Sequence, residues 1–258
     1  MDFVDTHCHL DCDPLGAAPA AVVARAAARG VTRIVVPAYD RASWAAVPPL
    51  ASLPGVFVAL GIHPWVAHTA DPGRLRDDLA AAIGAATRCV AVGEIGLDAK
   101  LGDEGPGLDV QLAVLRPQQE LAVDLDLPAI LHCRGAFTDL LAEVDRFGGR
   151  LRGVLHAWSR GPELAVRFTA AGLCLGLGGA VTRDKARARR AAQALPLEHF
   201  VLETDAPSIG LAGVPPAETE PHHVADIAAA LADLRGESIA TVAEVTTSHA
   251  CRLFGLEP

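Results

Sequence analysis

The sequence predicts an α/β protein in which eight strands and eight helices alternate in a single (β/α)8 TIM barrel. Three observations carry this prediction. The chain has 258 residues, of which 51% are hydrophobic, and chains of about 250 residues commonly form a one-domain barrel with a large core. Short apolar runs alternate with helical patterns along the whole chain. No second block of different composition interrupts them, so we expect one domain over residues 1–258.

Eight short apolar runs are the predicted strands. They cover residues 3–6, 33–37, 56–61, 89–94, 129–132, 153–156, 172–177 and 200–204. Alternation with helical patterns is typical of parallel strands joined by crossover helices. An open, doubly wound parallel sheet would show the same alternation, so it remains the alternative fold.

The helices between these strands have recognisable ends. Asp71 and Pro72 have the pattern of an N-cap followed by a first helical residue, and Glu220-Pro221 repeats it. Three helical stretches run to a glycine suited to a C-cap: 20–29 to Gly30, 162–171 to Gly172 and 221–235 to Gly236. Pro117 falls inside the helical pattern 110–123, where we expect a kink or a break.

The charge balance is acidic, with 22 basic and 31 acidic residues and a formal net charge of −9. Such a chain lacks the overall positive field that draws proteins to nucleic acid or to anionic membranes. A phosphate substrate would therefore need a local positive group, such as a metal ion or a single arginine.

Nothing in the sequence predicts export or a membrane span. The first residues have no basic segment followed by an apolar one, as a signal peptide would. The uncharged stretch 42–70 is interrupted by four prolines, which a spanning helix would not tolerate. The six cysteines form no CxxC pair, so we expect them to be reduced. We therefore predict a cytoplasmic protein without membrane contact.

Histidines and acids fall at the ends of the predicted strands. The first strand ends in Asp5-Thr6-His7-Cys8-His9. Side chains two positions apart in an extended segment share a face, so His7 and His9 point together with Asp5 behind them. The other strand ends supply Glu94, His132, His156 and Asp205.

In a barrel these strand ends meet at one face, where barrel enzymes place their active sites. A single histidine pair more often lies on the surface or packs in the core, but five strand ends that each deliver a ligand type favour a metal site. Six such groups suffice for two divalent ions about 3.5–4 Å apart that share one carboxylate, and Glu94 is the natural bridge. Nitrogen-rich ligation favours Zn, Mn, Fe or Ni over Mg.

Three further residues are candidates for contact with the substrate or the ligands. His63 ends the third strand, where it would bind substrate or brace a loop. Arg134 follows His132 by two positions and is the best candidate for a phosphate, because its planar fork matches phosphate oxygens; the alternative is an ion pair with Asp139 or Glu143. Glu203 would orient a ligand histidine or bond the nucleophile, or else form a buried ion pair.

The remaining aromatic and histidine residues carry weaker signals. Trp65, Trp158 and Phe137 could stack on bases, although large apolar loop residues more often pack. We interpret the other histidines as solvated or packing residues: His68, His199, His222, His223 and His249.

Taken together, these segments resemble the TatD family of metal-dependent deoxyribonucleases in the amidohydrolase superfamily. The matching segments span nearly the whole chain: Val4-Asp5-Thr6-His7-Cys8-His9-Leu10-Asp11, Gly61-Ile62-His63-Pro64, Gly93-Glu94-Ile95-Gly96-Leu97-Asp98, Leu131-His132-Cys133-Arg134, Leu155-His156 and Leu202-Glu203-Thr204-Asp205-Ala206-Pro207. The resemblance implies a TIM barrel with a dinuclear site that hydrolyses DNA, often from 3′ ends or in single strands.

The resemblance also implies roles for individual residues. One ion would be held by His7, His9, Glu94 and Asp205, and the other by Glu94, His132 and His156. Asp205 would accept a proton from the water nucleophile, and His63 and Glu203 would line the site.

Three segments depart from the family pattern. Ala99-Lys100-Leu101 stands where aromatics are frequent, and Ala157-Trp158 follows His156 where a Cys-Phe or Gly-Phe pair is common. The loop before the last barrel helix reads Ala217-Glu218-Thr219-Glu220-Pro221 instead of carrying Arg and Asn. Two acids near a phosphate channel would repel DNA.

The sequence thus supports three hypotheses about function. The first is a divalent-metal-dependent hydrolase that cleaves phosphodiester bonds of DNA with a metal-activated water, as an exodeoxyribonuclease without an obligate protein partner. The second keeps the dinuclear site but hydrolyses a small amide or ester, which the acidic loop favours. The third is a metal-binding scaffold without catalysis.

Overall fold

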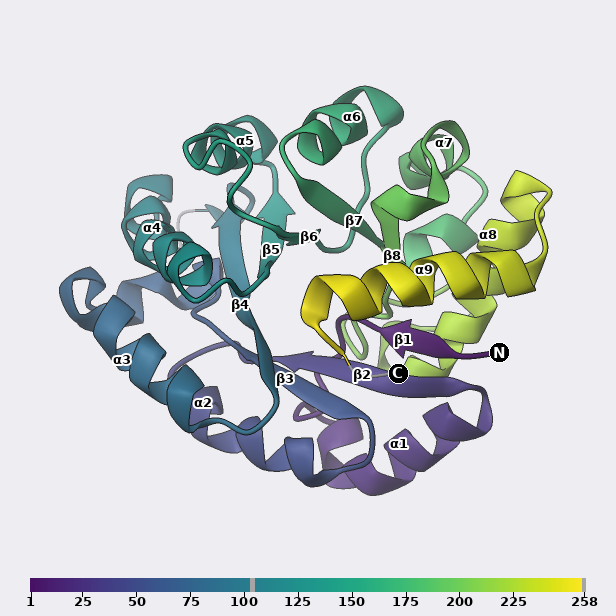
Figure 1. Cartoon of the computed structure of the whole chain (residues 1–258), viewed down its shortest axis with the longest axis horizontal. Coiled ribbons are helices and arrows are strands. Elements are labelled where there is room, and N and C mark those ends of the chain that lie inside the picture. The colour runs from purple at the N-terminus through teal and green to yellow at the C-terminus, as the bar shows by residue number, and fades with distance from the viewer. Residues whose placement is uncertain (103–104, 257–258) are drawn as a thin grey trace.

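Eight parallel strands form the centre of the computed structural model, which describes residues 1–102 and 105–256 (Figure 1). The strands are β1 (Phe3–Asp5), β2 (Val31–Pro37), β3 (Val56–Leu60), β4 (Cys89–Asp98), β5 (Ala129–Arg134), β6 (Gly153–Leu155), β7 (Leu173–Leu177) and β8 (Phe200–Leu202). Each predicted strand corresponds to one of these, with ends that differ by a few residues.

The sheet closes on itself. Its strands pair in the order β1 to β8, and every pair is parallel. The backbone N–H and the hydroxyl of Thr6, directly after β1, both donate to the carbonyl of Leu202 in β8, each at 3.0 Å. The first and last strands are therefore neighbours. This confirms the predicted (β/α)8 barrel and excludes the open doubly wound sheet; the extent of a single domain over residues 1–258 stays a prediction.

Helices surround the barrel and cover one of its ends (Figure 1). They are α1 (Pro19–Ala28), α2 (Ser43–Ala46), α3 (Pro72–Ala85), α4 (Leu108–Asp124), α5 (Phe137–Asp145), α6 (Pro162–Ala170), α7 (Arg187–Ala194), α8 (Val224–Arg235) and α9 (Ile239–Phe254). Short 3-10 turns occur at Leu15–Ala17, Pro48–Ser52, Pro64–Thr69, Gly179–Thr182, Leu197–His199, Pro216–Glu218 and Pro221–His223.

Helix ends agree with the local sequence in two places and differ in two. The Asp71 carboxylate accepts the N–H of Gly73 at 3.0 Å, as an N-cap does, and Gly236 ends α8 with a left-handed φ of 67°. The helix predicted from residue 221 begins at Val224, after a 3-10 turn. A break at Pro117 is wrong, because α4 continues through it with buried residues such as Val114 and Leu121 on both sides.

The barrel interior is packed with small side chains, and α9 closes one end. Alternate strand residues form an inner cluster: Val4, Val35, Ala59, Ala91, Ile130, Val154, Cys174 and Val201. Phe254 of α9 packs against this cluster, and the Thr247 hydroxyl donates to the carbonyl of Asp2, just before β1. Because α9 covers the end where the strands begin (Figure 1), the carboxyl ends of the strands form the open mouth.

Two strands extend further at their carboxyl ends than predicted, and this difference matters for the site. β4 continues past Glu94 to Asp98, and β5 continues past His132 to Arg134. The added residues pair Gly96 with His132 and Asp98 with Arg134. Residues 94–98 and 132–134 therefore run side by side at the mouth of the barrel.

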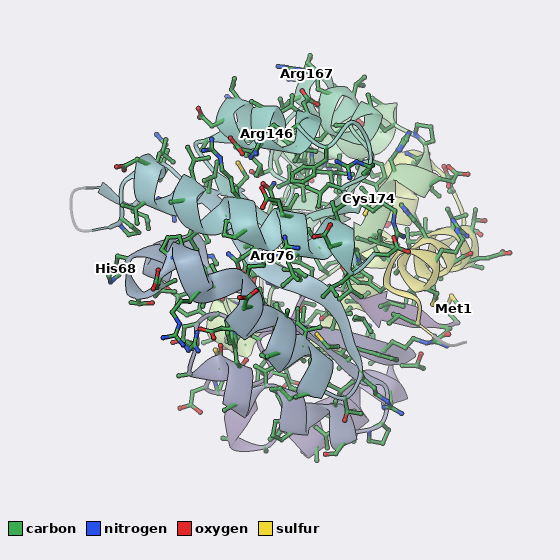
Figure 2. The ribbon with its side chains drawn as sticks, turned by 60° about the vertical axis from the view of Figure 1, so that its left-hand side comes forward. Met1, His68, Arg76, Arg146, Arg167 and Cys174 are labelled. Carbon is green, nitrogen blue, oxygen red and sulfur yellow. The ribbon has the colours of Figure 1, made fainter. Side chains whose placement is uncertain are left out.

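The outer surface carries charged side chains. Figure 2 shows Arg76 and Arg146 among the outer helices, and His68 at the periphery of the molecule. All six cysteines are free, as expected. In the described part of the chain, no helix combines the length and apolarity needed to cross a membrane. The cytoplasmic location stays a prediction from the sequence.

Candidate metal centre

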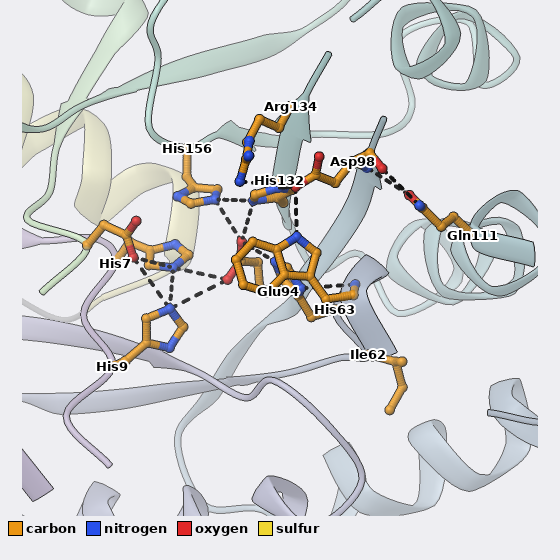
Figure 3. A network of polar contacts seen from close by, with 12 residues as sticks. His7, His9, Ile62, His63, Glu94, Asp98, Gln111, His132, Arg134 and His156 are labelled. Atoms are coloured by element: carbon orange, nitrogen blue, oxygen red, sulfur yellow. Dashed lines mark hydrogen bonds and ion pairs between the residues drawn. The ribbon is translucent and has the colours of Figure 1, made fainter. Parts of the chain in front are cut away.

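Six predicted ligands meet at the mouth of the barrel (Figure 3). They come from five strand ends: His7 and His9 after β1, Glu94 in β4, His132 in β5, His156 after β6 and Asp205 after β8. Four of these side chains are buried, and those of His9 and His132 are only slightly exposed. The convergence follows from closing the barrel, because positions far apart in sequence then share one rim.

Four donor atoms form a first cluster. His7 Nε2 lies 3.3 Å from His9 Nε2, 3.3 Å from Glu94 Oε2 and 3.7 Å from Asp205 Oδ1. His9 Nε2 lies 3.6 Å from the Glu94 oxygen and 3.5 Å from the Asp205 oxygen. Ligand atoms at about 2.1 Å from a tetrahedral ion are separated by about 3.4 Å, so this donor set fits a divalent transition metal.

A second cluster surrounds the other oxygen of the same carboxylate. Glu94 Oε1 lies 2.7 Å from His156 Nε2, 3.1 Å from His132 Nδ1 and 3.3 Å from His63 Nε2. His132 Nδ1 and His156 Nε2 are 3.3 Å apart. Glu94 therefore presents one oxygen to each cluster, which is the arrangement that a carboxylate bridging two ions requires.

The hydrogen-bond partners of His63 and His132 differ in which ring nitrogen they contact, and this affects which nitrogen carries the proton. His63 Nδ1 accepts the backbone N–H of Trp65 at 3.2 Å, so in the neutral ring Nε2 carries the proton and points it toward Glu94. His132 Nε2 faces the Asp98 carboxylate at 3.3 Å and Nδ1 faces Glu94 at 3.1 Å, so a ring that uses Nδ1 as a ligand has Asp98 as the acceptor of its Nε2 proton. Geometry groups His63 with possible metal ligands, but its hydrogen bond makes it a donor.

The two central carboxylates are ionised. Burial acts to raise the pKa of Glu94, but the surrounding histidines, His156 first among them, hold it well below its usual value. Burial also acts to raise the pKa of Asp205, and the hydrogen bond to His9 with the neighbouring imidazoles outweighs it. The cluster therefore offers anionic oxygens, as metal binding demands.

Glu203 lies behind a ligand and does not line the pocket. Its side chain is fully buried, and Oε1 accepts the N–H of Ala157 and lies 3.8 Å from His156 Nδ1. Burial raises the pKa of Glu203 to about 8. In this position it lies against His156 from behind, outside the described lining of the pocket.

Asp5 also serves the site from behind, as its place in the sequence predicts. Its fully buried carboxylate accepts the N–H of His7 at 3.2 Å and both the N–H and the hydroxyl of Thr204. It thereby fixes the segment that carries His7 relative to the segment that carries Asp205.

A pocket of about 550 Å³ opens above the clusters. Besides the ligands, its lining includes Tyr39, Trp65, Arg134 and Ile209. The Arg134 side chain is about half exposed, with Nη1 at 3.8 Å from Asp98 Oδ2. Arg134 thus lies at the edge of the pocket, where an anion can reach it.

Of the two alternative partners proposed for Arg134, Glu143 is engaged elsewhere, and no described ion pair joins Arg134 to Asp139. Glu143 accepts two hydrogen bonds from Arg116, at 2.8 and 3.0 Å, and one from Arg146 at 2.6 Å. The acid nearest to Arg134 among the described ion pairs is Asp98.

The aromatic candidates separate into one pocket residue and two packing residues. Trp65 is 40% exposed and lines the pocket. Trp158 is buried, with ring centroids 6.1 Å from Phe137 and 6.0 Å from Phe168. Only Trp65 is therefore available to a substrate.

The acidic loop does not extend into the pocket. Glu220 accepts two hydrogen bonds from Arg25 of α1, at 2.7 and 2.8 Å, and bonds to His222 at 3.2 Å. Neither Glu218 nor Glu220 belongs to the described lining of the pocket. Neither acid therefore lies at the pocket, and Glu220 is paired with an arginine outside it; the repulsion of DNA stays a prediction.

Asp98 is a site residue that the sequence analysis missed. It bonds His132 from behind and also accepts the indole N–H of Trp65 at 2.7 Å. The usable signal was the spacing of four between Glu94 and Asp98, which places two residues on one face of a strand. It went unrecognised because the predicted strand ended at Glu94.

A (β/α)8 barrel whose carboxyl end gathers histidines and carboxylates in two clusters has the architecture of a metal-dependent hydrolase. The family model described as TatD related DNase matches residues 4–255. The chain therefore belongs to the TatD family of metal-dependent hydrolases, and the resemblance inferred from the sequence is confirmed.

Similar proteins match this chain over nearly its full length. The chain is 35% identical over 256 residues to an uncharacterized metal-dependent hydrolase, YjjV, of Escherichia coli K12, with 98% of each chain covered. It is 30% identical over 264 residues to human deoxyribonuclease TATDN3, covering 98% of this chain and 95% of that protein. The crystal structure of YjjV, described as a TatD homologue, matches with a TM-score of 0.91 at 34% identity, covering 99% of this chain and 98% of the other.

Proposed function

We propose that this protein hydrolyses phosphodiester bonds of DNA and uses two divalent ions held at the mouth of the barrel. The observation that carries the proposal is the Glu94 carboxylate, whose two oxygens belong to two separate clusters of donor atoms. One ion would be held by His7, His9, Glu94 and Asp205, and the other by Glu94, His132 and His156. When bound, such ions activate water and neutralise charge that develops on a phosphoryl group.

Asp205 and His63 have different proton roles on two sides of the reacting group: Asp205 accepts a proton, and His63 donates a hydrogen bond. The Asp205 carboxylate is ionised and lies at the first cluster, so it accepts the proton that water loses as it attacks phosphorus. His63 points its Nε2–H into the second cluster, where a substrate oxygen accepts a hydrogen bond. This assigns His63 a catalytic and substrate-binding role without metal ligation.

Arg134 supplies the positive group that an acidic chain needs for a phosphate. Its guanidinium lies at the pocket edge, and a planar fork of donors matches phosphate oxygens. The nearby Asp98 leaves part of this fork free, because their contact is a single long one of 3.8 Å.

The shape of the pocket favours a strand end over intact duplex. A concave space of about 550 Å³ lies within the range of small-molecule sites, and a duplex is wider than such a space. The exposed face of Trp65 offers one base a surface for stacking. The name of the human relative, a deoxyribonuclease, supports the same substrate class.

The test is hydrolysis of labelled single-stranded, duplex and abasic oligonucleotides by protein reconstituted with Zn, Mn, Ni, Fe or Mg. We expect nucleotide release from single strands, no release in excess chelator, and an inactive Glu94→Ala variant. Arg134→Ala should raise KM more than it lowers kcat, and Arg150→Ala, at the opposite end of the barrel, should change neither.

A panel of amides and esters runs beside the oligonucleotides. Turnover on that panel without cleavage of any nucleic acid would replace this proposal with the amide or ester hydrolase. Full activity in chelator would contradict both, and metal uptake without turnover on any substrate would indicate a scaffold.

A further inference from the structure

Asp98 makes polar contacts with four groups at the base of the pocket. Figure 3 shows two of them, His132 and Arg134, beside the Asp98 side chain. Oδ2 lies 2.7 Å from Trp65 Nε1, 3.3 Å from His132 Nε2 and 3.8 Å from Arg134 Nη1, and Oδ1 accepts the N–H of Lys100 at 2.7 Å. The side chain is 1% exposed. A buried carboxylate with this many partners has a fixed orientation.

Three of the four groups that face Asp98 can only donate hydrogen bonds. Indole, guanidinium and backbone N–H groups only donate, so the imidazole of His132 is the one partner whose role is open. Carboxylate oxygens face both ring nitrogens, Glu94 Oε1 at 3.1 Å from Nδ1 and Asp98 Oδ2 at 3.3 Å from Nε2. An ion held by Glu94 and Nδ1 would leave Asp98 as the acceptor of the ring proton, which places that proton on Nε2. His132 Nδ1 then keeps its lone pair on the side of Glu94 and His156.

We propose that Asp98, held in place by the indole of Trp65, is a positioning residue that orients His132 toward the second ion. The inference rests on the ligand set of the proposed function, but it needs no particular substrate. A carboxylate behind a ligand histidine fixes the ring and its tautomer, and losing such a partner typically weakens metal affinity by about 10–100-fold.

Trp65 has a double role in this arrangement. Its backbone N–H makes His63 a donor, and its indole N–H holds the carboxylate that makes His132 a ligand. The two imidazoles lie 4.6 Å apart, centre to centre. Trp65, on the pocket wall, therefore helps to orient two neighbouring histidines, His63 as a hydrogen-bond donor and His132 as a metal ligand.

Two substitutions separate these contacts. Asp98→Asn keeps the shape, but its amide NH2 must face a donor on either side, since both carboxylate oxygens accept. Trp65→Phe removes the indole N–H together with part of the ring, and leaves the backbone bond to His63. Asp139→Asn is the matched control, because Asp139 is an exposed acid of α5.

The experiment titrates Zn²⁺ into each apo protein against a chromophoric chelator, and melts each apo protein separately. We expect two ions in the wild type. In Asp98→Asn one of the two affinities should fall by about 10–100-fold while the other is kept. Trp65→Phe should show a smaller fall at the same site, and Asp139→Asn none.

Unchanged Zn²⁺ affinities in Asp98→Asn and Trp65→Phe would overturn the proposal, as would equal losses at both sites. If Asp98→Asn does not fold, Trp65→Phe decides by the same criterion. A wild type that binds one ion overturns this inference together with the ligand set. A wild type that binds two ions but hydrolyses no phosphodiester overturns the proposed function alone.

Discussion

The Asp5 carboxylate accepts the Thr204 hydroxyl at 2.6 Å, and this bond joins the first and last strands of the barrel. The two residues are 199 positions apart, and both are fully buried. Each lies just before a candidate ligand, since Asp5 precedes His7 and Thr204 precedes Asp205. The closing seam of the barrel and the first metal cluster are therefore held by the same hydrogen bonds.

Replacing Thr204 with Val should destabilise the fold and disturb the first cluster together. The isosteric side chain leaves one oxygen of buried Asp5 without its hydroxyl donor, which costs about 1–3 kcal/mol. Urea unfolding measures the loss, and Zn²⁺ titration measures the cluster. Thr169→Val, which removes an exposed hydroxyl of α6, should change both by much less. A Thr204 variant as stable as the wild type would contradict this account of the seam.

His63→Asn and His132→Asn should behave differently, although both rings lie beside Glu94. Asn at position 63 still caps the N–H of Trp65 but is too short to reach Glu94, so both ions should stay bound while kcat falls by roughly 10²–10⁴-fold. Asn at position 132 should lose tight binding of one ion. Metal content after dialysis and single-turnover rates distinguish the two. Loss of an ion from the His63 variant would show that His63 is a ligand.

Removing metal should lower the melting temperature of the wild type. Free ion at about 100 times its dissociation constant contributes about 2.7 kcal/mol per site, which corresponds to roughly 5–10 °C for a chain of this size. Scanning calorimetry with Zn²⁺ and with excess chelator measures the difference. Glu94→Gln lacks the shared anion, so its two melting curves should nearly coincide. A wild-type curve insensitive to chelator would argue against metal binding at this site.

Gly176→Ala should be destabilising because β7 leaves no room for a methyl group beside Glu203. A Cβ at position 176 would lie 2.1 Å from Glu203 Oε2, and the shift needed to relieve such a clash costs about 1–3 kcal/mol. Because Glu203 lies against His156, a shift of its side chain should disturb that ligand, and Zn²⁺ affinity should fall as well. Gly84→Ala is the control, since a Cβ there meets nothing within 4 Å and favours α3 by about 0.5–1 kcal/mol.

The Glu143 ion pairs should make stability depend on pH in the acidic range. Hydrogen bonds from Arg116, then those from Arg146, hold the pKa of Glu143 below its ordinary value of 4.5. A lowered folded-state pKa gives stability that is present above the unfolded pKa and is lost as pH falls through the folded one.

Glu143→Gln should therefore be less stable than the wild type by about 1–2 kcal/mol at pH 7, a modest figure because both arginines are half exposed. The difference should shrink below pH 4.5 and vanish in stronger acid. Urea melts between pH 2.5 and 7 measure it, with exposed Glu163→Gln as a variant that should stay near zero. A difference that grows on acidification would contradict the assignment.

Much of the fold was predictable because strand and helix patterns are local. The apolar runs at residues 56–61 and 172–177, for example, correspond to β3 and β7 within one residue at each end. Pro117 misled the prediction, since its effect depends on whether packing on both sides of α4 outweighs one missing hydrogen bond. The helix α9 was not predicted. It packs on strand residues that are distant from it in sequence, and only the closed barrel brings these together.

By itself the sequence determined which chemistry is present: imidazoles and carboxylates at strand ends, in the order and spacing of a metal-dependent hydrolase. Only the tertiary structure decided what each group does. It turned the Nε2–H of His63 and the Nδ1 atom of His132 toward the same carboxylate, placed Glu203 behind His156, and paired Glu220 with Arg25. The physical reason is that the state of an imidazole or an acid depends on the atoms within about 4 Å of it, and here those atoms come from segments that only the closed barrel brings together.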